Sequence, residues 1–165
     1  MPESSAAKDF VLPAAVYSPQ LLESVIYDLQ VYVDWIRQNE IRARVGANSK
    51  DAPNHSDETV LVIEAWQKGK APTIDSIHAL LSHLKALKLP EVHITLAALP
   101  NHAQRRTLVE WFRNNTVPGL LVSFVADRNL GGGLVVRTPN HVFNYSWRQE
   151  LVAGRDKLAE IVRRV

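Results

Sequence analysis

Three consecutive glycines, Gly131-Gly132-Gly133, are the first residues in this chain that could do chemistry, because glycine-rich loops can bind phosphate through their backbone N–H groups. The known phosphate-binding loops lead into the N-terminus of a helix, and many carry a Gly-Lys-Ser/Thr sequence. Here the glycines lead into Leu-Val-Val-Arg, which is typical of a strand, and no Gly-Lys-Ser/Thr sequence occurs. We therefore interpret them as a turn between strands that requires positive φ angles.

The six histidines are the second candidate, since histidine can bind a metal or act as a general base. His78 and His83 are five residues apart in a predicted helix, whereas two ligands on one helical face are three or four apart. His93, His102 and His141 are isolated. The chain contains no cysteine and no Gly-x-Ser-x-Gly sequence of a serine hydrolase. We expect no catalytic residue, no metal site and no cofactor.

Three arginines, Arg105, Arg106 and Arg113, share one predicted helix with Trp111 and Phe112. Cations beside aromatic rings can bind single-stranded nucleic acid. The two rings fall on the apolar side of the helix, so we expect them in the core and expect no nucleic acid to bind. The arginines are then candidates for binding a protein partner.

Composition is that of a globular protein with one domain or two small ones. The chain has 165 residues, 46% of them hydrophobic, and a mean hydropathy of −0.12. It has no apolar run of about 18 residues, and its first ten residues have no apolar segment, so we expect neither a transmembrane helix nor a signal peptide. Residues 1–90 carry a net charge of −2 and residues 91–165 a net charge of +4, so the second half is expected to meet an acidic partner.

Capping residues and helical periodicity predict helices in the first half. Ser18 followed by Pro19 is a typical helix start. Ser56 begins a second segment, in which Val-Leu-Val-Ile could also form a strand; we favour helix because Gly69 provides a stop. Thr73 begins a third helix. We expect a partly ordered lead-in over 1–17, a helical domain over 18–89, a first helix ending near Gln38, and a loop over 39–56.

The second half changes period. Apolar and polar residues alternate from Val92 to Leu96, which predicts a strand, and Asn101 is a typical cap for the helix that follows. Ser146 and Gln149 have the spacing of a capping box, so a final helix is expected there. Its apolar stripe consists of Trp147, Leu151, Leu158, Ile161, Val162 and Val165. The predicted fold class is α+β: a helical bundle, then a β-α-β-β-β-α domain over 91–165.

Two blocks between residues 127 and 151 resemble a known family. The delta subunit of F-type ATP synthase, called the oligomycin-sensitivity-conferring protein in mitochondria, has a C-terminal D-x-x-L-x-G-G-L-V-V-R sequence followed by V-x-D-x-S-x-R-x-x-L. This chain departs from it at Arg128, where proline is usual, and at Asn144, where aspartate is common. The matching residues are Asp127, Leu130, Gly132, Gly133 and Arg137, then Ser146, Arg148 and Leu151.

The resemblance covers about residues 91–165 and implies a non-catalytic stator subunit of the peripheral stalk, acting during proton-driven ATP synthesis. In that family an N-terminal helical domain binds the alpha subunit and the C-terminal domain binds the b subunit. It implies a peripheral place on the cytoplasmic face of a bacterial plasma membrane, with membrane contact only through the complex. The alternative from the residues is a basic α/β adaptor that binds RNA or another protein complex.

Overall fold

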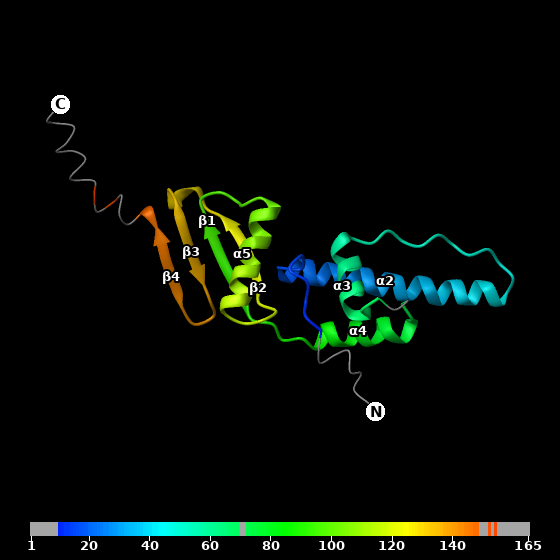
Figure 1. Cartoon of the computed structure of the whole chain (residues 1–165). Coiled ribbons are helices and arrows are strands. Elements are labelled where there is room, and N and C mark those ends of the chain that lie inside the picture. The colour runs from blue at the N-terminus through cyan, green and yellow to red at the C-terminus, as the bar shows by residue number, and fades with distance from the viewer. Residues whose placement is uncertain (1–9, 70–71, 149–151, 153, 155–165) are drawn as a thin grey trace.

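The structure, a computed structural model, describes residues 10–69, 72–148, 152 and 154. It is a mixed α+β arrangement in which three helices lie at one end and a four-stranded sheet with one helix at the other (Figure 1). The elements in chain order are α2 (Pro19–Arg44), α3 (Asp57–Gln67), α4 (Ile74–Ala86), β1 (Glu91–Leu96), α5 (His102–Asn115), β2 (Leu121–Ala126), the 3-10 turn η1 (Arg128–Leu130), β3 (Gly133–Arg137) and β4 (Val142–Ser146).

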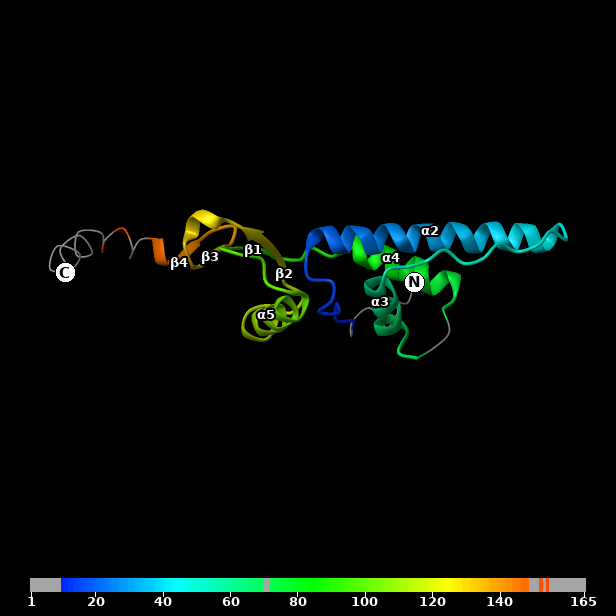
Figure 2. The same cartoon turned by 90° about the horizontal axis from the view of Figure 1, so that it is seen from above.

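Helix α2 begins where the sequence predicts, since the Ser18 hydroxyl accepts a hydrogen bond from the Leu21 N–H at 3.3 Å. The predicted end near Gln38 is wrong, because the helix continues to Arg44. The extra residues include Glu, Ala and Arg, which have high helix propensity. The basic residues in the last turn also stabilise the helix through their interaction with its dipole. No apolar stripe marks these turns, because they extend beyond the other two helices (Figure 2).

Helices α3 and α4 confirm the predicted helical segments. The Val-Leu-Val-Ile run lies in α3, so the strand alternative is excluded. Ser56 is the N-cap residue of α3, but its hydroxyl donates to Asp28 of α2 at 2.8 Å instead of capping its own helix. The Thr73 hydroxyl caps α4 by accepting from the Ser76 N–H at 3.3 Å.

The three helices enclose a core that also includes residues of the segment before α2. Leu12 and Val16 are 4% and 0% exposed. The sequence predicted a partly ordered lead-in over 1–17; Leu12 and Val16 instead pack in the core, with Phe10 partly buried against it and Val11 exposed, and residues 1–9 lie outside the described residues. The helical side chains of this core are Val25, Leu29, Val33, Val62, Trp66, Ile77, Leu80 and Leu84.

The sheet has the strand order β2-β1-β3-β4. Strands β1 and β2 are parallel, while β3 is antiparallel to both β1 and β4. Helix α5 packs against one face (Figure 2), and the alternation of side chains makes that face apolar in all four strands. Its residues are Val92, Ile94 and Leu96, then Val122, Phe124 and Ala126, then Leu134 and Val136, then Phe143 and Tyr145.

The chain leaves the sheet at Ser146, the last residue of β4, whose N–H donates to the Asn144 side chain at 2.9 Å. Trp147 and Arg148 are helical, and Ser146 therefore lies at the predicted helix start. Gln149, Leu151 and most of the expected final helix lie outside the described residues. Within the described ranges, no helix combines the length and the apolar character needed to cross a membrane.

Candidate functional site

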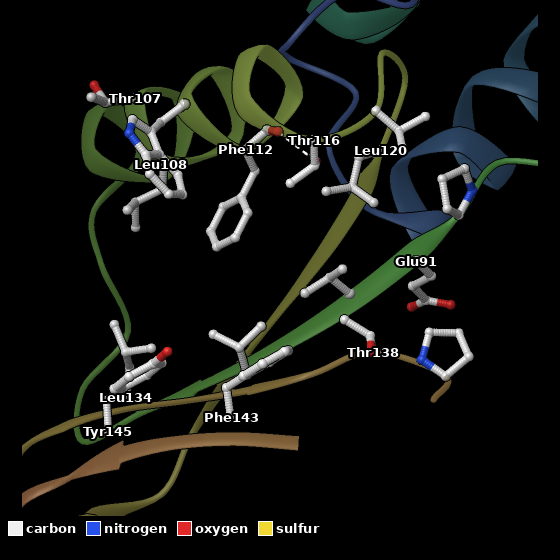
Figure 3. A pocket seen from close by; sticks show the side chains of 16 residues that line it. Glu91, Thr107, Leu108, Phe112, Thr116, Leu120, Leu134, Thr138, Phe143 and Tyr145 are labelled. Atoms are coloured by element: carbon white, nitrogen blue, oxygen red, sulfur yellow. Dashed lines mark hydrogen bonds between the residues drawn. The ribbon is translucent and has the colours of Figure 1, made fainter. Parts of the chain in front are cut away.

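A large apolar groove, with a volume of about 910 Å³, lies between α5 and the sheet (Figure 3). Its floor is formed by β1, β3 and β4, and one wall is α5. The lining side chains that matter most are Leu108, Trp111, Phe112, Leu134, Val136, Phe143 and Tyr145. A surface of this kind can bind an apolar or amphipathic ligand.

The groove exists because α5 covers only part of the apolar sheet face. Val122 in β2 is 0% exposed, whereas Phe143 and Tyr145 in β4 are 44% and 64% exposed. All three side chains point to the same face of the sheet. The uncovered half of this face therefore lies over β3 and β4.

Trp111 forms part of the helical wall and is 57% exposed, so the prediction that it lies in the core is wrong. Phe112, its neighbour, packs partly buried against the sheet core, as expected. The two rings meet edge to face with centroids 5.1 Å apart. Adjacent residues on a helix differ by about 100° in direction, so only one of the pair can point fully at the sheet.

The glycine block builds the turn from β2 to β3, which confirms its interpretation as a backbone feature. Asp127 accepts the Asn129 N–H at 2.9 Å at the start of η1, and the buried Leu130 ends that turn. The φ angles of Gly132 and Gly133 are +150° and +74°. A Cβ on Gly132 would lie 2.5 Å from the Trp147 ring, and one on Gly133 would collide with the Tyr145 carbonyl oxygen.

Among the remaining residues of the two blocks, Arg137 is exposed at the end of β3, on the sheet face opposite the groove. Arg148 is exposed just after β4. The structure thus brings the Asp127–Gly133 turn and Ser146 together at one end of the β3–β4 pair, where Gly133 lies opposite Ser146.

The arginines of α5 have separate surroundings. The Arg113 guanidinium donates to three backbone carbonyl oxygens, of Leu12 at 2.8 Å, Val16 at 2.9 Å and Leu120 at 3.0 Å. Burial lowers the pKa of Arg113 from its ordinary value, but an arginine remains charged near neutral pH. The hydrogen bonds of the Arg113 guanidinium are therefore made within the protein, to the backbone of other segments of the chain.

Arg105 donates to the Pro100 carbonyl oxygen at 2.9 Å and to the Tyr17 hydroxyl at 3.1 Å. Arg106, by contrast, is exposed. The partner-binding role of the three arginines stays a prediction, and Arg106 is the member of the set best placed for it.

A smaller, mixed cavity of about 360 Å³ lies beside the start of α2 and is lined by Tyr17, Arg105, His93 and Ser123, among others. Ser123 donates to Glu91 at 2.8 Å, and His93 lies 3.7 Å from the same carboxylate. No group of three or more potential metal ligands occurs among the residues that the structure describes.

The groove is the feature that sequence reasoning missed. The signal was present: Phe143 and Tyr145 alternate in β4 and fall on the same side as Leu134 and Val136 of β3. One helix between β1 and β2 is too narrow to cover four such strands.

The chain matches no known protein family, and none of the curated proteins compared with it matches either.

Proposed function

We propose that this chain is a non-catalytic stator subunit resembling the ATP synthase delta subunit, with an N-terminal helical bundle followed by a β-α-β-β-β-α domain. The two blocks between Asp127 and Leu151 are the basis of the resemblance. The observation that carries the proposal is the connection between the two halves. A protein that resists torque needs two binding regions held rigidly relative to each other.

That connection is made through residues 12–17, which contact both halves. Val16 is fully buried in the helical core, while its carbonyl oxygen accepts a hydrogen bond from Arg113 of α5. The Tyr17 carbonyl oxygen accepts the Val122 N–H of β2 at 2.5 Å. Leu121 of the same strand is 5% exposed and belongs to the helical core. Such a shared segment favours transmission of force over hinge motion.

The proposed partners follow from the resemblance: the alpha subunit for the helical half and the b subunit for the sheet half. The net charge of +4 on residues 91–165 would speed encounter with an acidic partner segment. The proposed location is peripheral, on the cytoplasmic face of a bacterial plasma membrane, reached only through the complex. No cofactor and no nucleic acid are part of the proposal.

The test is reconstitution. Membranes stripped of their own delta subunit are loaded with the catalytic head and the purified full chain, and ATP-driven proton pumping is measured. We expect restored pumping and recovery of the chain with both the alpha and b subunits. Two results together would instead support the adaptor alternative. The assembled head and stalk would be isolated without the chain, and the chain would bind RNA tightly in a fluorescence titration.

A further inference from the structure

The apolar sheet face is about twice as wide as the helix that covers it. Four strands spaced about 4.8 Å apart span roughly 19 Å, whereas a helix with its side chains is about 10 Å across. Helix α5 covers the side of β2 and β1 and leaves the aromatic rings of Phe143 and Tyr145 uncovered (Figure 3). The groove therefore has the width of one further helix.

The chain itself supplies a segment of suitable length directly after β4. Residues 147–165 would form a helix of roughly 28 Å, and the five residues of β4 extend for about 17 Å. Six of their apolar residues fall on one face of such a helix and form a stripe, which Gly154 and Arg155 interrupt between Leu151 and Leu158. That stripe consists of Trp147, Leu151, Leu158, Ile161, Val162 and Val165.

The geometry of the exit from β4 sets the direction. Tyr145 and Leu134 lie at one end of the groove, and Glu91 and Thr138 lie at the other (Figure 3). The chain leaves β4 beside Tyr145, so a helix that covers the groove must turn back antiparallel to β4. Leu158, about 16 Å beyond Trp147 along such a helix, then reaches the end of the groove near Thr116.

We propose that residues 147–165 pack in this groove as an amphipathic helix, with the stripe against the sheet and the charged residues outward. The occupant is this chain's own C-terminal segment, and the proposal does not depend on the partners proposed above. A docked helix places Arg148, Lys157, Arg163 and Arg164 on its flanks and outer surface and Arg155 at the edge of the stripe, against three acidic residues of the same segment. The surface offered to a partner is then this basic face, and the groove is internal.

Adjacent substitutions in the full chain test the proposal. Leu158→Asp puts a charge on the stripe, and Lys157→Asp puts the same group about 100° around the helix, on its flank. We expect the first to lower the melting temperature by roughly 4–10 °C and to raise binding of an apolar dye, since the groove opens. We expect the second to change the melting temperature by less than about 2 °C. Equal, small effects of both substitutions would overturn the proposal.

Disulfide trapping gives a second readout, because the chain has no cysteine of its own. Thr116→Cys combined with Leu158→Cys should form an intramolecular disulfide at least tenfold faster than Thr116→Cys combined with Lys157→Cys. Disulfide-linked dimers would show that a second copy occupies the groove and would overturn the proposal. Equal rates for the two pairs would do the same, because they would indicate that the segment has no fixed orientation in the groove.

Discussion

The helical half and the sheet half bury their apolar residues to different extents. In the helical half, α2, α3 and α4 each turn a stripe to a common centre, and Leu29, Ile77 and Leu80 are fully buried. In the sheet half, the same face that buries Val122 completely leaves Tyr145 64% exposed. Three helices with Leu12 and Val16 of the preceding segment close one core, whereas an apolar face of four strands needs a cover of its full width.

The connection between the halves depends on residues that no periodicity marks. Residues 10–17 belong to no helix or strand, yet Leu12 and Val16 complete the helical core and their carbonyl oxygens bind Arg113 of the sheet half. The comparison can be tested by substitutions that act on the sheet turn, on the connection, within the helical half, and on the outer surface.

The largest effect is expected from Gly133→Ala in the sheet half. Gly133 and Gly46 have nearly equal φ angles, +74° and +70°, but only at Gly133 would a Cβ collide with backbone, at the Tyr145 carbonyl oxygen. Backbone strain alone costs about 1 kcal/mol, and the collision should bring the cost at Gly133 above about 3 kcal/mol. Urea unfolding of the two alanine variants measures the difference. Equal losses of unfolding free energy in the two variants would mean that β3 and β4 can move apart to accommodate the Cβ without loss of stability.

The sequence predicted this turn and most of the regular elements because their signals are local. Ser18, Thr73 and Asn101 cap helices, and the glycines mark the turn, each within a few residues of the feature that they determine. The last turns of α2 could not be predicted in this way, because solvent-exposed helix has no apolar stripe. The packing of residues 10–17 depends on α5, about 100 residues further along the chain, and no local pattern contains that information.

Arg113→Met should have the next largest effect, because it removes the connection while keeping most of the side-chain volume. Three carbonyl oxygens would lose a charged donor, for an expected loss of about 3 kcal/mol. Arg106→Met on the same helix is the control and should change stability by less than about 0.5 kcal/mol. Hydrogen exchange should also rise at the Val122 N–H, which donates to Tyr17. A similar loss in both variants would indicate a general effect on α5.

The candidate site was predicted less well than the fold. The three arginines of α5 were grouped because they are close in sequence, but helical geometry directs Arg113 inward to carbonyl oxygens and leaves Arg106 outside. The apolar pattern of the same helix also predicted a core position for Trp111, which is exposed. Its exposure depends on how far α5 lies from β4, and that distance is a property of the assembled sheet.

A smaller effect, confined to the helical half, is expected from Asp28→Asn. Burial raises the pKa of Asp28, but hydrogen bonds from Ser56 and Thr59 outweigh it and hold the pKa below its usual 3.8. The ionised carboxylate thus stabilises the fold above about pH 4, and this contribution is lost as the pH falls through the lower folded-state pKa. We expect a loss of less than about 1 kcal/mol at pH 7, since the group is partly solvated.

The difference between the parent chain and Asp28→Asn should therefore shrink as the pH is lowered below about 4. Thermal unfolding at pH 7, 4 and 3 measures it, with Asp34→Asn on the exposed side of α2 as the control. A difference that grows toward acid pH would contradict the sign of the pKa shift.

The smallest effect on the fold is expected from Arg106→Glu, which should leave the melting temperature within about 2 °C of the parent value because the side chain is exposed. If the sheet half meets the acidic stalk partner proposed above, the same change should slow association. Exposed charge pairs are worth about 0–1 kcal/mol each and are screened beyond about 8 Å at physiological salt. The slowing should therefore be severalfold at low salt and much weaker at physiological salt, with little change in dissociation. Arg137→Glu is the control, because it makes the same charge change on the opposite face of the sheet. If both variants slow association equally, the effect comes from net charge alone. If only Arg106→Glu slows it, the encounter surface lies on α5.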